Sequence, residues 1–264
     1  MELVKFRQAK AAEIDRLTRN PPRLEDQPAG LARPDFLASL RQGQAQRGLA
    51  LIAEYKRASP SLGDIDLALS PHSVVAAYAA AEAISVLTEE TYFKGRLSFL
   101  AELAPSGQPL LRKDFIFEPA QLLETALYPA SAVLLIVRLT PRLEALAGLI
   151  NLALSLGLCP VVEIFDPREL ALAREAGARV IQVNARDLET LKVDPLGPIQ
   201  LIKKFPPQAE EFWIAASGLA KAADLARVRA AGFGAALIGS ALMASGDPGA
   251  ALAELIKGLV TVHP

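Results

Sequence analysis

The chain alternates between short apolar runs and longer segments rich in Ala, Leu, Arg and Glu. The short runs have the length and composition of strands that are buried on both faces, and the longer segments have the length of helices. On this basis we predict eight strands, over residues 50–56, 84–88, 110–113, 133–137, 161–164, 180–184, 212–216 and 235–239.

Helix boundaries are marked by two recurring signals, a capping residue followed by proline at the start and a glycine just beyond the end. The starts are marked by Ser70-Pro71, Thr140-Pro141 and Asp166-Pro167, and the ends by Gly157, Gly177 and Gly232. Together with the apolar spacing, these signals predict helices over residues 71–81, 141–156, 167–176, 222–231 and 247–260.

Alternating strands and helices predict a parallel sheet with right-handed crossovers. Eight such units fit a closed (β/α)8 TIM barrel, whose usual size is about 250 residues. The alternative is a doubly wound open sheet, but no G-x-G-x-x-G motif follows the first strand. With 264 residues, 52% of them hydrophobic, the chain is expected to form one α/β domain over residues 1–264.

Residues 1–49 do not follow this alternation. Val4, Ala11, Ile14 and Leu17 form an apolar stripe, and a proline-rich stretch over residues 21–34 follows it. A second short helix is predicted after Asp35, with Phe36, Leu37 and Leu40 on one side. Because an apolar helix face must be buried, we expect residues 1–49 to be a helical extension packed on the barrel mouth.

Composition excludes several classes of function. A formal net charge of −1 argues against nucleic-acid binding through phosphate attraction. The single cysteine, Cys159, rules out an intramolecular disulfide and a cysteine metal cluster. The first residues lack a secretory apolar region, and no apolar run approaches the ~18–20 residues of a membrane span. We therefore expect a cytoplasmic protein with no metal and no membrane or nucleic-acid partner. The expected oligomeric state is a monomer, which the composition does not determine.

The first predicted strand carries an acid and an amine at its end. Side chains two residues apart in a strand share a face, so Glu54 and Lys56 point the same way. The preceding residues, Leu51 to Ala53, are typical of a strand covered on both faces. Burying these charges costs desolvation free energy, which indicates a functional role. A surface ion pair on an edge strand is the alternative.

Further polar residues end the later strands, where active sites of such barrels lie. Lys113 ends the third strand, Glu163 lies on the fifth, and Asn184 and Arg186 end the sixth. Each has a plain alternative: a surface pair of Lys113 with the next aspartate, a helix cap for Glu163, and an Asx turn for Asn184. Together they predict two carboxylates, two amines and an amide at one mouth.

Small residues follow the last two strands, as Ser217-Gly218 and Gly239-Ser240. Such residues let backbone N–H groups approach a phosphate. Ordinary glycine turns are the alternative for each pair alone. Their joint position predicts a phosphate site.

At this point the chain resembles a known family, the indole-3-glycerol phosphate synthases of tryptophan biosynthesis. The resemblance rests most on segments 52–61 (IAEYKRASPS) and 111–116 (LRKDFI). Further similar segments are 85–95 (SVLTEETYFKG), 133–136 (VLLI), 162–164 (VEI), 183–188 (VNARDL) and 237–243 (LIGSALM).

The resemblance implies conversion of 1-(2-carboxyphenylamino)-1-deoxyribulose 5-phosphate into indole-3-glycerol phosphate, CO₂ and water, without metal or organic cofactor. Lys113 matches the family's general acid, and Lys56 is the neighbouring cation that can favour proton release. Glu163 and Glu54 match the carboxylates that move protons, and Asn184 can hold a substrate hydroxyl.

The resemblance also implies a substrate-binding set. The candidates for contact with the substrate carboxylate are Arg57, Ser59 and Arg186. The candidates for contact with its phosphate are Ser217, Gly218, Gly239 and Ser240. Phe93, Phe115 and Leu134 match the apolar wall around the anthranilate ring, for which plain core packing is the alternative.

The chain departs from the family pattern at three positions. Ala216 stands where the family usually has glutamate, Gln182 where glycine is common, and Ala185 where asparagine or serine is common. We favour a working synthase with altered hydrogen bonds, because Lys113 and Glu163 are present. A sugar-phosphate isomerase barrel is disfavoured by the two lysines, and a non-catalytic barrel is supported mainly by Ala216.

Overall fold

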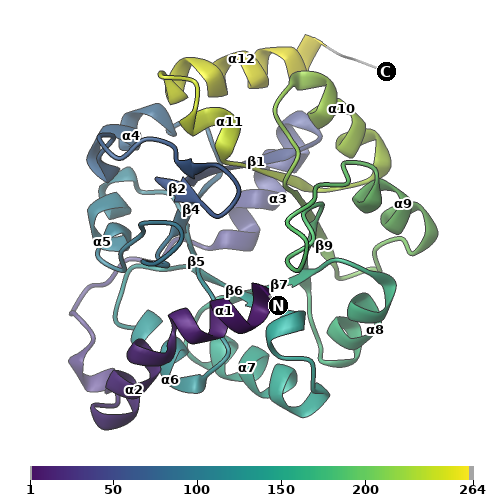
Figure 1. Ribbon diagram of the computed structural model, residues 1–264. Coiled ribbons are helices and arrows are strands. Elements are labelled where there is room, and N and C mark those ends of the chain that lie inside the picture. Colours follow the sequence, from purple (N-terminus) through teal and green to yellow (C-terminus); the bar gives the residue numbers. More distant parts are fainter. Residues whose placement is uncertain (1, 262–264) are drawn as a thin grey trace.

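The computed structural model describes residues 2–261 and shows eight parallel strands closed into a barrel (Figure 1). Neighbouring strands follow the order β1-β10-β9-β8-β7-β6-β5-β4, which confirms the predicted (β/α)8 fold. The barrel strands are β1 (Ala50–Tyr55), β4 (Ala83–Leu87), β5 (Leu110–Lys113), β6 (Ala132–Ile136), β7 (Cys159–Ile164), β8 (Val180–Asn184), β9 (Phe212–Ala216) and β10 (Ala235–Ile238).

A short antiparallel ribbon, β2 (Ala58–Ser59) and β3 (Gly63–Asp64), lies in the loop after β1. The helices around the barrel are α4 (Pro71–Ala77), α5 (Phe99–Leu103), α6 (Pro119–Thr125), α7 (Leu143–Ser155), α8 (Pro167–Glu175), α9 (Gly197–Lys204), α10 (Ala222–Ala231), α11 (Ser240–Met243) and α12 (Pro248–Thr261). Short 3₁₀ turns are η1 (Leu24–Asp26), η2 (Ala104–Ser106) and η3 (Val137–Leu139).

Two of the three predicted helix starts are confirmed. Ser70 accepts a hydrogen bond from the backbone of Ser73, and Asp166 caps α8. The start at Thr140-Pro141 is wrong, because Thr140 closes η3 with a 2.9 Å bond from its N–H to the Val137 carbonyl. Helix α7 therefore begins only at Leu143.

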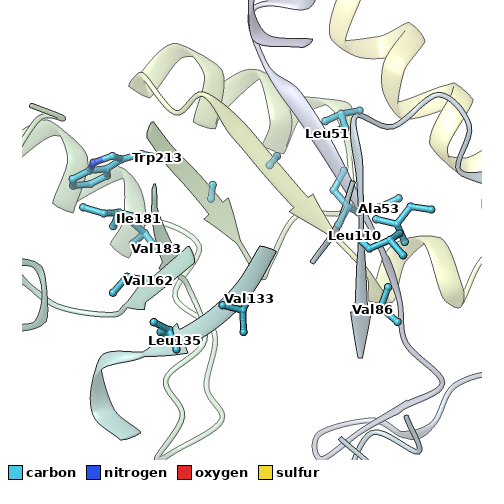
Figure 2. Packing of buried hydrophobic residues seen from close by; sticks show 14 of the residues in the cluster. Leu51, Ala53, Val86, Leu110, Val133, Leu135, Val162, Ile181, Val183 and Trp213 are labelled. Atoms are coloured by element: carbon cyan, nitrogen blue, oxygen red, sulfur yellow. The ribbon is translucent and has the colours of Figure 1, made fainter. Parts of the chain in front are cut away.

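The pleat of each strand separates two apolar layers. Inward side chains such as Ile52, Leu134 and Ile214 fill the barrel interior. Outward side chains such as Val162 and Trp213 pack beneath the surrounding helices (Figure 2). Each strand is thus buried on both faces, and its alternate residues point toward the barrel axis, where the polar strand ends meet.

The N-terminal extension divides between the two ends of the barrel. Helix α1 (Glu2–Ala9) crosses the mouth, and α2 (Ala11–Arg19) lies beside α6 (Figure 1). Helix α3 (Phe36–Arg47) lies behind the barrel in this view. Its Phe36 and Leu40 pack among the first residues of the strands, Ala50, Phe212 and Ala235.

The expectation that all of residues 1–49 cover the mouth is therefore wrong for α3. The reason is the short connection that follows it. Gly48 adopts a left-handed conformation (φ 74°) that ends α3, and β1 begins at Ala50. So short a link keeps the helix at the end of the barrel where β1 starts, and α3 closes that end.

Candidate active site

A cavity of about 460 Å³ opens at the carboxyl ends of the barrel strands. Its volume lies in the usual range for small-molecule sites. Fourteen of the fifteen predicted site residues line it, and Arg57 does not. The fourteen are Glu54, Lys56, Ser59, Phe93, Lys113, Phe115, Leu134, Glu163, Asn184, Arg186, Ser217, Gly218, Gly239 and Ser240.

Glu54 and Lys56 form a closed pair at the end of β1. Lys56 Nζ lies 2.8 Å from Glu54 Oε1, and Ser85 Oγ lies 3.4 Å from Oε2. Burial alone would raise the pKa of Glu54, but the ammonium groups of Lys56 and Lys113 and these hydrogen bonds outweigh it and lower the pKa. Glu54 is therefore held as a carboxylate.

Lys113 and Glu163 form a more open pair across β6. They come from β5 and β7, which flank β6, and Lys113 Nζ lies 3.7 Å from Glu163 Oε2. The same Oε2 accepts a hydrogen bond from the amide of Gln182. Since Lys113 Nζ lies beyond a normal hydrogen-bond distance from this oxygen, it can turn to a substrate oxygen without breaking a tight contact.

Asn184 is held by its own turn. Its Oδ1 accepts a 2.9 Å hydrogen bond from the backbone of Arg186, so the Asx-turn alternative also holds. This bond orients the amide, whose Nδ2 is the group that can donate to a ligand in the cavity. The Arg186 side chain is steadied by a 2.8 Å bond to the Leu191 carbonyl.

The two small-residue turns place backbone against the cavity. Ser217 and Gly218 both have positive φ angles, 69° and 70°. Within residues 2–261 the Gly218 N–H makes no hydrogen bond, so it is available to an anion. At Gly239, an added Cβ would lie 2.3 Å from Glu54 Oε1, so only glycine fits beneath this carboxylate.

An aromatic wall closes one side of the cavity. Phe115 stacks on Phe6 of α1 with 4.3 Å between ring centroids, and Phe93 lies 6.1 Å from Phe115. Phe6 was not predicted from the sequence, although it is the single aromatic residue of the first helix. Its sequence position gives no sign that α1 returns to the mouth.

Glu89 is a second lining residue that the sequence reasoning missed. Its buried carboxylate accepts hydrogen bonds from the backbone N–H groups of Thr91, Tyr92 and Phe93. It thereby fixes the loop that carries Phe93. An acidic residue at the end of a buried strand was part of the signal that identified Glu54, and Glu89 directly follows the predicted strand over residues 84–88.

Arg57 is the one predicted site residue that does not line the cavity. Its guanidinium binds the Leu67 carbonyl and lies 5.9 Å from the centre of the Phe99 ring. The cause is strand parity: Glu54 and Lys56 face inward, so Arg57, one residue on, faces outward.

The surface-pair alternative for Lys113 is wrong. The next residue, Asp114, is buried and binds Lys10 at 2.9 Å and Arg112 at 3.2 Å. Burial alone would raise the pKa of Asp114, but Lys10 and Arg112 outweigh it and lower the pKa. This network ties the N-terminal extension to the residue after Lys113. The helix-cap alternative for Glu163 is wrong too, because Asp166 caps α8.

The three departures from the family pattern lie on β8 and β9 or directly beyond β8. Ala216 lines the cavity and pairs in register with Asn184. Gln182 is fully buried inside the barrel, and Ala185 is buried and donates its N–H to the Ala216 carbonyl. Position 216 therefore faces the site, as the predicted register of β9 requires.

Two further properties of residues 2–261 bear on ligands. This part of the chain holds no group of three or more His, Cys, Asp or Glu side chains that could bind a metal ion. No helix in it combines the length and apolar character needed to cross a bilayer.

Comparison with known proteins gives a consistent result. The model of the family described as indole-3-glycerol phosphate synthase matches residues 3–255. The chain is 43% identical over 224 residues to the indole-3-glycerol phosphate synthase of Desulfosudis oleivorans, with 84% of each chain covered. The enzyme of that name from Chlorobium phaeovibrioides is 38% identical over 242 residues, covering 90% of this chain and 93% of the relative.

Solved structures agree on the fold. The crystal structure of 3-hexulose-6-phosphate synthase from Salmonella typhimurium aligns with a TM-score of 0.63 at 16% identity. The alignment covers 81% of this chain and 100% of that one. At this identity the likeness shows a shared barrel and nothing about chemistry.

Proposed function

Because the chain belongs to the indole-3-glycerol phosphate synthase family, we propose that it closes the indole ring of indole-3-glycerol phosphate. The substrate is 1-(2-carboxyphenylamino)-1-deoxyribulose 5-phosphate, and CO₂ and water are released. The observation that carries the proposal is the pair of lysine–glutamate contacts facing one cavity, at 2.8 Å and 3.7 Å. Since a carbon–carbon bond to CO₂ is broken, the enzyme is a carboxy-lyase.

Ring closure needs a proton donor at the ribulose carbonyl. Lys113 donates this proton as the ring carbon that bears the carboxylate attacks the carbonyl carbon. Loss of CO₂ then restores the aromatic ring and leaves a hydroxyl on the new five-membered ring. Lys56 and Glu54 fix the charge around this step, since their close contact holds both side chains in place.

Dehydration needs an acid and a base. Glu163, in its protonated form, gives a proton to the leaving hydroxyl. Glu54 has a lowered pKa and is therefore ionised. It accepts the proton from the adjacent ring carbon. Two protons are donated and one is accepted, and the net proton taken up balances conversion of a carboxylate into CO₂.

Binding is divided among the other lining residues. The phosphate lies against the backbone of Ser217, Gly218, Gly239 and Ser240. Arg186 and Ser59 hold the substrate carboxylate, and Asn184 holds a hydroxyl. The anthranilate ring lies in the wall formed by Phe6, Phe93, Phe115 and Leu134.

The deciding experiment is incubation of the purified protein with the substrate while indole fluorescence is followed. We expect turnover without added metal and with a chelator present, and a monomer of about 28 kDa by sedimentation. Absence of turnover under all conditions would favour the non-catalytic barrel. Fluorescent-tag imaging would test the proposed cytoplasmic location.

A further inference from the structure

Gln182 is a polar side chain in the apolar interior of the barrel. It lies on β8, pairs in register with Glu163 on β7 and Ile214 on β9, and is fully buried. It does not line the cavity. Inward neighbours such as Val161 and Val180 are apolar, so the amide lies in a medium where unbonded polar groups are costly.

The contacts of Gln182 lead to the site. Its Nε2 donates to Glu163 Oε2, and its Oε1 has no hydrogen-bond partner among the described residues. Glu163 Oε1 likewise makes no hydrogen bond within residues 2–261, so it is the oxygen left to exchange a proton with a substrate. Glu54, the other carboxylate of the site, has a comparable donor from the barrel interior, because Ser85 Oγ donates to it.

We propose that Gln182 is a positioning residue that fixes the orientation of the Glu163 carboxyl group for proton transfer. An amide is suited to a group that changes protonation state, because it carries a donor and an acceptor at the same end. Nε2 donates to the carboxylate. A half-turn of the amide offers the unpartnered Oε1 to the protonated acid. A methionine of similar length would offer neither.

The test compares Gln182→Met with the wild type by steady-state kinetics across pH. We expect kcat to fall about tenfold with KM within about twofold, because the group acts on the chemical step and not on binding. We also expect the pH profile of kcat to move to higher pH. The substitution removes a hydrogen bond that favours the charged form of the Glu163 carboxyl group.

Two further variants separate positioning from packing. Ile214→Val changes volume at the register partner of Gln182 without changing polarity, and its kcat and pH profile should match the wild type. Gln182→Glu keeps the length but places a second carboxyl beside Glu163. It should move the pH profile further in the same direction, since like charges disfavour ionisation. If thermal unfolding shows that Gln182→Met does not fold, Gln182→Glu replaces it in the test.

This inference rests on the proposed activity, and different results would overturn the inference and the activity. A folded Gln182 variant with unchanged kcat and pH profile would overturn the positioning role, as would a rise in KM alone or an equal effect of Ile214→Val. A wild type without turnover would instead overturn the proposed function, and the positioning role with it.

Discussion

The two lysine–glutamate pairs at the mouth of the barrel are built differently. Glu54 and Lys56 come from one strand end and lie 2.8 Å apart. Lys113 and Glu163 come from two strands separated by β6 and lie 3.7 Å apart. Coulomb attraction scales inversely with distance, so it is weaker by only about a quarter in the second pair. The larger difference is the direct hydrogen bond, which only the first pair makes.

From this difference we infer a division of labour between the two pairs. The closed pair holds Glu54 as the carboxylate that we propose as the base, and the pKa of Glu54 is lowered there although burial alone would raise it. The open pair keeps an ammonium and a carboxyl that can each reach a substrate atom. Substitutions in the two pairs should therefore have different effects, and the following experiments test this in order of expected size.

The largest effect should come from Lys113→Ala. Removing a positioned general acid typically costs about 10²–10⁴ in rate, so kcat should fall in that range with substrate binding within a few-fold. Single-turnover fluorescence and substrate titration would measure both. Lys203→Ala, at an exposed lysine of α9, is the control. Activity of Lys113→Ala near the wild-type level would remove Lys113 from the chemistry.

Lys56→Met should act on stability and on its pH dependence. Breaking a buried ion pair typically costs about 3 kcal/mol, since the remaining charge stays buried. In the wild type the pKa of Glu54 is lowered in the folded state. The stability that the charged Glu54 contributes is therefore fully present above its unfolded pKa of about 4.3, and it is lost as the pH falls through the folded-state pKa. In the variant, the charge of Glu54 stays buried without Lys56 at neutral pH, which destabilises the fold. Protonation of Glu54 at acid pH removes this destabilisation.

The Tm difference between wild type and Lys56→Met should therefore be largest near neutral pH and shrink as pH falls below about 4. Thermal unfolding at several pH values would measure it. A Tm difference that stays constant from pH 7 to pH 3 would contradict the closed-pair interpretation.

Gly218→Val should affect binding more than chemistry. Its φ of 70° is unfavourable for a β-branched residue, and its Cβ would meet Val193 Cγ1 at 3.0 Å. We expect KM to rise about tenfold, corresponding to roughly 1.4 kcal/mol of lost binding. Gly177→Val is the matched control, because Gly177 also has positive φ but has open space around it. Equal KM values in wild type and Gly218→Val would argue against a phosphate at this turn.

The smallest effect should come from Ala216→Glu, and its sign is informative. A rise in kcat would mean that the natural site lacks a useful carboxylate. A fall would mean that the site has adapted, because a new carboxylate would raise the pKa of Glu54 and compete for the lysines. Since Ala216 lines the cavity, unchanged kcat, KM and pH profile would contradict its placement beside the reacting groups.

The chain by itself determined the features that depend on short spacing. Strand periodicity places Glu54 and Lys56 on one face and Arg57 on the other, and the same rule accounts for the position of Arg57 outside the cavity. Ser70 and Asp166 fixed two helix starts because a cap acts within a few residues. Eight strand–helix units were enough to indicate the closed barrel.

Only the tertiary structure decided which distant groups meet. The contact of Lys113 with Glu163 depends on the register of β5, β6 and β7. The contact of Gln182 with Glu163 depends on the register of β7 and β8. Phe6 of the extension stacks on Phe115, and the buried ion pair of Lys10 with Asp114 ties the extension to the residue after β5. These contacts join residues far apart in sequence. Barrel closure and strand register set their distances, and local spacing carries no information about either.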